Sequence, residues 1–342
     1  MRRSSSLHPG ATCCALALLA GAVSATAIGQ NDFVVPNWAY PMNPPANGAP
    51  PPPDDRMLLR VPNSRAAFTQ AQVKDLFAVP DWHPDSHPSM PDVVARGRKP
   101  SVYACGYCHL PDGTGRPENA PLAGLPAEYI VAQVAAMRSG TRRSAAKGAY
   151  LPIEFMRTVA EHATEPEVRE AAAYFATLCL TRRVRIVETE RVPVTRVAGW
   201  LWVPVEGGGT EPLGQRIIEV PVDDERHELR DAETGYVACV PPGSIVRGEQ
   251  LAIQGGDSLT LPCSGCHGSD LRGVGLIPPI AGRSPTYILR QLLAFRTGAR
   301  SSESGRPMQP VVERLGIDDM IAIAAYVGSR EAAASSSRRT GW

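Results

Sequence analysis

Two cysteine–histidine motifs are the residues of this chain whose types and spacing can do chemistry. Two segments follow the pattern CxxCH, namely Cys105-Gly-Tyr-Cys108-His109 and Cys263-Ser-Gly-Cys266-His267. In this pattern two thiols can add to the vinyl groups of a porphyrin while the adjacent histidine ligates the iron, which is the attachment chemistry of haem c. A bare CxxC would also suit zinc or thiol redox chemistry, but the histidine after each pair favours haem. The sequence therefore predicts two covalently bound haem c groups, held by the four cysteines, with the two histidines on the iron.

The two motifs stand at the head of segments that repeat each other. A constant offset of 158 residues relates Cys105 and Cys263, Pro121 and Pro279, Tyr129 and Tyr287, Gln133 and Gln291, and Arg142 and Arg300. Farther along the chain the offset becomes 152 residues, and it then pairs Met156 with Met308. The change of offset falls before Met156, in a polar, glycine-containing stretch that is typical of a loop. Self-similarity over this length predicts two homologous units in tandem.

Caps and periodicity predict helices in both repeats. In the second repeat, a serine cap and a proline open an apolar pattern of helical spacing over 284–298, and its counterpart covers 126–140. A capping box at Thr164–Glu167 opens a further helix that reaches Phe175. Its counterpart runs over about 318–327. A helix carrying CxxCH, a middle helix and a terminal helix make an all-α unit.

The N-terminus predicts export. Arg2 and Arg3 precede an apolar run from Ala11 to Ala22, and small residues follow it. This order is typical of a secretory signal peptide, so residues 1–27 are expected to be cleaved off during transport to the periplasm. An uncleaved anchor is the alternative, although the run is short for a membrane span. The mature chain is expected to have no transmembrane segment.

Composition limits the classes of function. A net charge of +1 in 342 residues argues against nucleic acid or an anionic membrane as a general partner. The length allows two or three domains. The 33 prolines and 31 glycines, with 6% aromatic residues, indicate small domains rich in irregular chain. Such domains bury too little apolar surface to offset their ordering entropy, so we expect haem to complete each core.

Two regions lie outside the repeats. Residues 28–91 begin with a proline-rich arm that is expected to be extended, followed by a short helix near Gln70–Phe77. Residues 181–246 alternate valine and isoleucine with charged residues, which predicts a small β-rich insert. Residues 331–342 form a polar tail that is expected to be disordered.

With these motifs in place, the chain resembles the class I cytochromes c, and most closely the tandem dihaem cytochromes of the c-four type. The resemblance covers 92–180 and 247–330. It rests on the CxxCH motifs, the repeated Tyr, Gln and Arg-x-Gly-x-Arg positions, the later Met and a final Ala-Ala-Tyr helix. It implies a mainly α fold of two tandem class I cytochrome c domains with the β-rich insert between them. It also implies Met156 and Met308 as sixth iron ligands, and the carbonyls of Pro121 and Pro279 as acceptors for the proximal histidines.

The residues themselves favour the same axial ligands. Thioether sulfur favours reduced iron and raises its potential, and of the eight methionines only Met156 and Met308 occupy equivalent places in both repeats. The alternative is that they fill a core, as methionine often does and as we expect for Met137. His83 and His87 are rival ligands, but the prolines between them favour an ordered loop. His162 could also replace Met156.

Further residues have open roles. The expected contacts of the haem propionates are Arg142, Arg300, Tyr129 and Tyr287. The alternatives are a solvated surface for the arginines and plain packing for the tyrosines. Cys179 and Cys239 either form a disulfide, as an oxidising compartment allows, or remain two separate thiols. A role as thiolate haem ligand is disfavoured because neither replaces a missing methionine.

With His and Met on both irons, no coordination position is left for oxygen, peroxide or a sulfur substrate. The sequence therefore predicts a non-enzymatic electron carrier that exchanges single electrons with periplasmic redox proteins, such as a dehydrogenase or a terminal oxidase. One alternative is a cytochrome subunit that docks on such a complex through the insert. Another is a dihaem enzyme, similar to thiosulfate dehydrogenases or peroxidases, with one iron open or ligated by cysteine.

Overall fold

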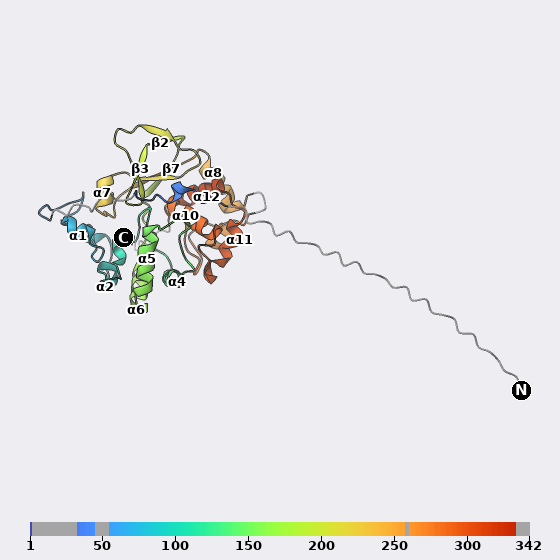
Figure 1. The fold of residues 1–342 in the computed structure, drawn as a ribbon, viewed down its shortest axis with the longest axis horizontal. Coiled ribbons are helices and arrows are strands. Elements are labelled where there is room, and N and C mark those ends of the chain that lie inside the picture. The colour runs from blue at the N-terminus through green and yellow to red at the C-terminus, as the bar shows by residue number, and fades with distance from the viewer. Residues whose placement is uncertain (2–32, 45–54, 257–259, 333–342) are drawn as a thin grey trace, which may run out of the picture. The chain divides into compact units, whose positions relative to one another are not determined.

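The computed structural model describes Met1 and residues 33–44, 55–256 and 260–332 (Figure 1). Almost all of the predicted signal peptide, most of the proline-rich stretch and almost all of the predicted tail lie outside these ranges. The residues from Val35 onward belong to one compact unit. Among the helices in the described ranges, none combines the length and apolar character needed to cross a membrane.

The first repeat is helical. Its helices are α2 (Asp92–Ala95), α3 (Cys105–His109), α4 (Ala127–Arg138), α5 (Leu151–His162) and α6 (Glu165–Thr177). The predicted capping box opens α6, since the Thr164 side chain accepts from the Glu167 amide and the Glu167 side chain accepts from the Thr164 amide. A core that includes Val94, Ala172 and Phe175 holds α2, α4 and α6 together.

The helix α5 is a departure from the sequence prediction. It begins at Leu151, inside the stretch before Met156 that was expected to be a loop. Pro152 lies in its first turn, where a missing N–H costs no hydrogen bond. Met156 therefore lies on a helix that packs against α4, and its direction is fixed by that packing.

The second repeat has the same order of helices. They are α8 (Ser244–Glu249), the π-helical turn η3 (Gln250–Gln254), α9 (Ser264–His267), α10 (Pro285–Arg296), η4 (Glu303–Met308), α11 (Gln309–Val312) and α12 (Ile317–Ser329). As predicted, the Ser284 side chain caps α10 by accepting from the Tyr287 amide. The helices α8 and α12 cross closely at Gly248, where a Cβ atom would stand 2.0 Å from the Ala322 carbonyl oxygen. Only glycine allows that approach.

All strands that the described residues form lie between Val184 and Val240. They are β1 (Val184–Glu188), β2 (Arg191–Pro193), β3 (Thr195–Ala198), β4 (Leu201–Pro204), β5 (Thr210–Pro212), β6 (Ile218–Pro221) and β7 (Tyr236–Val240). β7 is the centre of a three-stranded sheet, parallel to β1 and antiparallel to β6. β2 pairs with β5, and β3 pairs with β4. A short helix that the sequence did not predict, α7 (Asp224–Glu228), connects β6 to β7.

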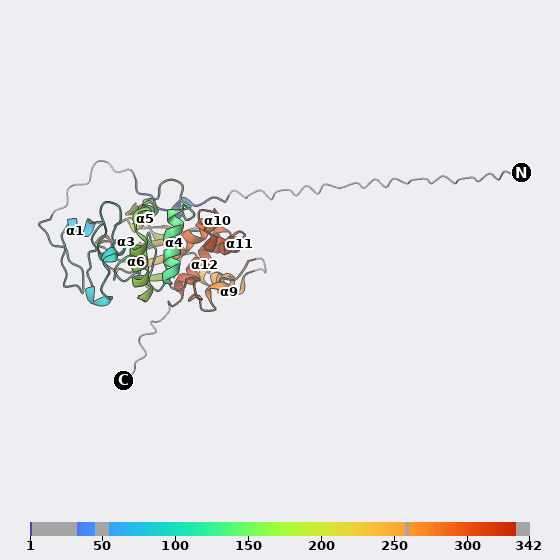
Figure 2. The same cartoon turned by 90° about the horizontal axis from the view of Figure 1, so that it is seen from below.

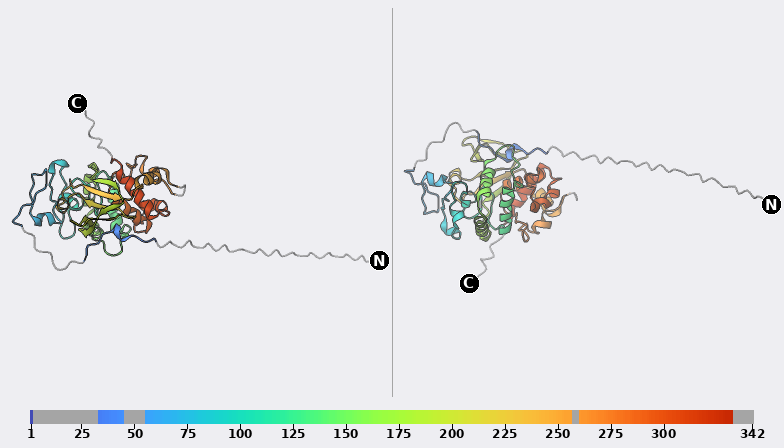
Figure 3. Two further views of the ribbon diagram at one scale, coloured as in Figure 1. Left: turned by 90° about the horizontal axis from the view of Figure 1, so that it is seen from above. Right: turned by 60° about the horizontal axis from the view of Figure 1, so that its bottom comes forward.

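The segment before the first repeat is packed against the insert. It contains η1 (Asn37–Ala39), α1 (Gln70–Lys74) and η2 (Pro84–Ser86). The predicted short helix is thus present but ends at Lys74. Trp82 is 2% exposed and packs with Val61 and Val73 against Leu229, which follows α7. Figure 3 shows the residues from α1 to η2 on one side of the molecule, with the insert and α4–α6 between them and the second repeat. In contrast, η1 contacts α10 of the second repeat, where Arg290 donates to the Ala39 carbonyl at 2.6 Å.

The two repeats meet along equivalent segments. Figure 2 shows α4 of the first repeat beside α10 of the second. Just beyond these helices, Arg142 and Arg300 form an antiparallel bridge. Around it, the Arg143 amide donates to the Ala299 carbonyl at 2.7 Å and the Ser301 amide donates to the Thr141 carbonyl at 2.8 Å. Residues that the repeat alignment pairs are therefore neighbours in space.

Candidate haem sites

The first CxxCH motif forms the short helix α3, which places both cysteines and the histidine on one turn. The His109 Nδ1 atom lies 2.7 Å from the Ala120 carbonyl oxygen. Because a carbonyl only accepts, Nδ1 carries the proton and the Nε2 lone pair is available to a metal. Burial lowers the pKa of His109, which favours the same neutral, ligating form.

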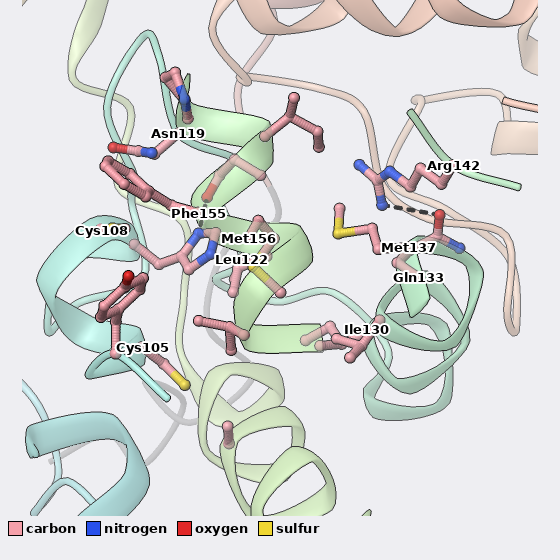
Figure 4. A pocket seen from close by; sticks show the side chains of 18 of the residues that line it. Cys105, Cys108, Asn119, Leu122, Ile130, Gln133, Met137, Arg142, Phe155 and Met156 are labelled. Carbon is pink, nitrogen blue, oxygen red and sulfur yellow. Dashed lines mark hydrogen bonds between the residues drawn. The ribbon is translucent and has the colours of Figure 1, made fainter. Parts of the chain in front are cut away.

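A cavity of about 180 Å³ that opens to solvent adjoins this motif. Its walls come from α3, α4, α5 and α6 and are largely apolar, with Val102, Leu125, Ile130, Val134 and Phe175 among the lining residues. Figure 4 shows Cys105 and Cys108 on one side of this space.

Met156 lines the same cavity. Figure 4 shows its side chain extending from α5 into the space beside Cys108 and Leu122. Met137 also lines the cavity, and it packs with Val134 and Ala160 as the sequence predicted for a core residue. Besides the two cysteines, these two methionines are the sulfur donors among the described lining residues. The structure therefore brings Met156 and the first CxxCH motif to one cavity, and ligation by Met156 remains a prediction.

The second CxxCH motif repeats the local geometry. The His267 Nδ1 atom lies 2.8 Å from the Pro278 carbonyl oxygen, and burial again lowers the pKa of the imidazole. Met308 is partly buried at the end of η4, in the place that the repeat alignment gives it. Cys266 is exposed, whereas its counterpart Cys108 is partly buried.

The prediction for Pro121 and Pro279 is wrong by one residue. The carbonyls that accept from the two histidines belong to Ala120 and Pro278, each directly before the predicted proline. The residue before a proline is restricted to extended backbone, which fixes the direction of its carbonyl. The Pro121 and Pro279 carbonyls instead both accept from Arg283, at 2.6 and 2.7 Å.

The repeated Arg, Gln and Tyr positions form one network across the two repeats. Its six members are Gln133, Gln291, Arg142, Arg300, Tyr129 and Tyr287. Arg142 donates to Gln133 of its own repeat at 2.9 Å and to Gln291 of the other at 3.3 Å. Arg300 mirrors it, donating to Gln291 at 3.0 Å and to Gln133 at 2.8 Å. Each guanidinium also reaches the tyrosine hydroxyl of the opposite repeat, at 3.4–3.5 Å.

The same network concentrates positive charge inside the protein. Arg142 and Arg300 are 8% and 5% exposed, and neither forms an ion pair with a carboxylate of the described chain. Burial and the charge of Arg142 lower the pKa of Arg300. Although burial alone would raise it, the two guanidinium groups lower the pKa of Tyr129. The expectation of a solvated surface for these arginines is thereby excluded, and an anionic group beside them would be stabilised.

The rival ligands have other partners. The His83 Nε2 atom lies 2.8 Å from Asp231, and His87 contacts Asp81 and the Tyr174 hydroxyl at 3.2 Å each. His162 is exposed, and its Nδ1 donates to the Thr158 carbonyl at 2.8 Å. The predicted ordered loop around η2 is therefore present.

The two remaining cysteines of the described chain are free in the structure. Cys239 is buried on β7 beside Val192 and Ile218, and Cys179 is exposed. The structure thus has two separate thiols in place of the alternative disulfide.

Comparison with known proteins places the chain in a family. The model of the family described as "Cytochrome c" matches residues 246–331, which contain the second CxxCH motif. Cytochrome c-554(548) of Halomonas halodenitrificans is 37% identical over 70 residues, which are 20% of this chain and 84% of that protein. The chain belongs to the cytochrome c family.

Two longer matches extend the similarity beyond one motif. Cytochrome c4 of Azotobacter vinelandii is 25% identical over 240 residues, or 69% of this chain and 88% of that protein. The thiosulfate dehydrogenase electron acceptor of Stutzerimonas stutzeri (strain A1501) is 36% identical over 140 residues, or 36% of this chain and 63% of that protein. The resemblance to cytochromes of the c4 type is confirmed.

Membership of the cytochrome c family implies covalently bound haem c, and the residues fit that group. The attachment cysteines, a histidine with a free Nε2 and an apolar cavity surround the first motif. Arg142 and Arg290 are buried and line the cavity, so they supply the positive charge that two carboxylate side chains of a haem would need. The signal for the network was in the sequence, since Gln133 and Gln291 repeat, but their joint contact with both arginines was not foreseen.

Proposed function

We propose that this chain is a periplasmic dihaem c-type cytochrome that passes single electrons between redox proteins. Residues 1–27 form its cleaved signal peptide, 92–180 and 247–330 its two haem-binding domains, and 181–246 the insert between them. The observation that carries the proposal is the repetition of one local site. In both repeats, the histidine of a CxxCH motif donates its Nδ1–H to a carbonyl that stands directly before a repeated proline.

Each proposed haem site uses four residues, namely two cysteines for attachment, one histidine and one methionine. The first is formed by Cys105 and Cys108 with His109 and Met156, and the second by Cys263 and Cys266 with His267 and Met308. Haem c, when bound, supplies a one-electron couple. A histidine and a thioether as axial ligands favour the reduced state and leave no position for a substrate. The proposal is therefore an electron carrier and not an enzyme.

The chain's own residues set the conditions for transfer. The carbonyls of Ala120 and Pro278 fix the tautomer and the ring orientation of the two histidines. Apolar walls on α4 and α6 exclude water from the first site. Arg142 and Arg300 offset the charge of the haem propionates. Because both arginines contact both repeats, they also hold the two sites in one fixed relation.

A more specific role is favoured by one comparison. A relative with 36% identity is named as the electron acceptor of thiosulfate dehydrogenase. We propose that the electron donor of this chain is a dehydrogenase that oxidises inorganic sulfur compounds. Mixing the reduced-sulfur substrate, such a dehydrogenase and the oxidised chain should reduce both haems, and the substrate alone should reduce neither. Reduction by the substrate alone would instead support a dihaem enzyme.

The carrier proposal is tested by spectroscopy of the purified holoprotein. We expect two haems per chain in a pyridine haemochrome assay, low-spin ferric spectra and a sulfur-to-iron charge-transfer band. We also expect no binding of carbon monoxide by the ferrous protein, because both irons have six ligands. One haem per chain, or carbon monoxide binding by the unmodified protein, would contradict the proposal. N-terminal sequencing of the exported protein tests cleavage after residue 27.

A further inference from the structure

The first CxxCH motif is covered by residues of the insert. Arg230, just after α7, places its guanidinium 3.6 Å from the centre of the Tyr107 ring. Its Nη1 donates to the Tyr107 carbonyl at 3.0 Å. Tyr107 stands between the two attachment cysteines, so Arg230 lies directly over the motif. We define the cover as residues 224–231, which comprise α7 and the turn that follows it.

The cover is held in place from outside the insert. The Trp82 Nε1 donates to the Leu229 carbonyl at 2.7 Å, and His83 contacts Asp231 at 2.8 Å. Asp231 has no exposed side-chain surface and also pairs with Arg226 at 2.6 Å. Arg230 itself has a φ of 58°, a value that is unusual for a long side chain. A residue keeps such a backbone only where its surroundings fix it, and these contacts on both sides do so.

A second arginine joins the cover to the first repeat. The Arg116 Nη2 donates to the Nε2 of His227, and the Arg116 Nε lies 3.0 Å from Glu118. Since Arg116 can only donate, the proton of His227 is on Nδ1, which lies 3.0 Å from the Tyr236 hydroxyl. His227 is 1% exposed, and burial followed by the charges of Arg116 and Arg230 holds its pKa well below the usual range. The contact is therefore made by a neutral histidine.

The charge of the cover that reaches the attachment edge is that of Arg230. Arg116 is paired with Glu118, whereas the Arg230 guanidinium stacks on the ring of Tyr107, the residue directly before Cys108.

The second motif has no equivalent of this cover within the described chain. Under the offset of 158 residues, Tyr107 becomes Gly265, Arg116 becomes Val274 and Glu118 becomes Leu276. Val274 and Leu276 are 58% and 66% exposed. The edge that is covered and charged in the first repeat is open and apolar in the second.

We infer that the cover makes the first haem the electron-retaining one of the pair. The inference rests on the proposed function. Ferric haem carries one more positive charge than ferrous haem, so a nearby guanidinium and the exclusion of water both disfavour oxidation. Both effects raise the potential of the first haem above that of the second. The open second edge is then the one through which solvent and reductants reach the pair first.

The test is a spectroscopic redox titration of the holoprotein with Arg230→Gln, which keeps a planar polar side chain but removes the charge. Separate Met156→His and Met308→His variants assign the two waves, since each should move one wave only. We expect Arg230→Gln to lower the midpoint potential of the wave assigned to the first haem and to leave the midpoint potential of the other wave unchanged. The electron-distribution equilibrium between the haems should change about tenfold, or about 59 mV for one electron.

Two further variants separate charge from structure. Arg230→Lys keeps the charge without the planar stacking group and should restore most of the shift. Arg191→Gln removes an exposed charge on β2, where the side chain contacts Thr210 and not the cover, and it should move neither wave. In hydrogen–deuterium exchange, the peptide containing residues 105–109 should exchange faster in Arg230→Gln only. This second readout needs no electron transfer.

The outcomes distinguish the two proposals. The protein could bind two haems and show two assignable waves, with no selective shift in Arg230→Gln. That result would contradict the proposed role of the cover and leave the carrier proposal intact. Equal shifts of both waves, or the same shift in Arg191→Gln, would also contradict the proposed role of the cover. Fewer than two haems per chain would instead remove the proposed function on which the inference rests.

Discussion

The two CxxCH segments carry the same attachment residues in different surroundings. In the first, Cys108 is partly buried and the insert lies over the motif, with Arg230 on the Tyr107 ring. In the second, Cys266 is exposed and Leu276 is 66% exposed. The residues of the attachment motif are thus repeated, while the residues that surround it are not. Two equal motifs therefore stand in unequal surroundings.

The largest expected effect comes from removing one pair of cysteines. Replacing Cys105 and Cys108 by alanine should leave one haem per chain, and replacing Cys263 and Cys266 should leave the other. The first variant should also unfold at the lower temperature, because the apolar cavity beside its motif would lose the group that fills it. Haem absorbance per chain and thermal denaturation measure the two results. Unchanged absorbance in either variant would exclude that motif as an attachment site.

Removing one methionine ligand should have the next largest effect. Met156→Ala and Met308→Ala should each open one iron to carbon monoxide and lower one midpoint potential by on the order of 0.1 V, within the ~0.8 V range that axial ligands set. Met137→Leu is the matched control, since Met137 lines the same cavity but packs in the core. Carbon monoxide difference spectra of the ferrous proteins measure the effect. Carbon monoxide binding by Met137→Leu but not by Met156→Ala would show that Met137, and not Met156, is the iron ligand.

The arginine network should affect both centres alike. Arg142→Gln and Arg300→Gln each remove hydrogen bonds of a charged donor, so each should lower the free energy of unfolding by about 1–3 kcal/mol. The double variant should lose less than the sum, because the two arginines share Gln133 and Gln291 as acceptors. Urea denaturation gives these values. Both midpoint potentials should fall together, in contrast to the single wave expected for Arg230→Gln.

The smallest expected effect concerns an ion pair at the start of the last helix of the first repeat. The pKa of Glu167 is lowered to about 2, chiefly by the hydrogen bond from Arg98 and further by the hydrogen bonds with Thr164. A lowered carboxyl pKa stabilises the fold above the ordinary value of 4.5, and that contribution is lost as the pH falls to about 2. Glu167→Gln should therefore lower the free energy of unfolding by about 1 kcal/mol at neutral pH. The effect is no larger because the Arg98 side chain is half exposed and solvent screens its charge.

The pH dependence provides the control for that variant. The difference in unfolding free energy between Glu167→Gln and the unmodified protein should shrink between pH 4.5 and 2 and vanish at its acid end. The equivalent residue of the second repeat is Asp319, whose carboxylate accepts from the Gly316 amide and pairs with Arg247. Asp319→Asn should have a smaller effect, because the cap residue Gly316 has no side chain and only the carboxylate half of the cap and the ion pair are repeated. A difference that persists undiminished at pH 2 would contradict this account.

The site could be predicted where a local pattern carries the information. The CxxCH spacing and the caps at Thr164 and Ser284 depend on a few neighbouring residues, and the structure has each in its expected place. The prediction placed the carbonyls that accept from the two histidines one residue too late. The backbone direction before a proline decides which carbonyl faces the histidine, and the sequence pattern does not show that direction. Helix α5 was missed because the whole stretch before Met156 was assigned to a loop, although Ile153, Met156 and Ala160 recur at helical spacing and pack in one cluster with α4 residues.

The sequence by itself determined that this chain carries two haem-attachment motifs, each with its histidine, and that they belong to repeated helical segments. Covalent attachment needs only the thiols and the imidazole at fixed spacing, and spacing is a property of the sequence. Only the tertiary structure decided that Arg142 and Arg300 meet between the repeats and that residue 230 lies over residue 107. Those contacts join positions more than 100 residues apart, so they exist only after packing has brought distant segments together.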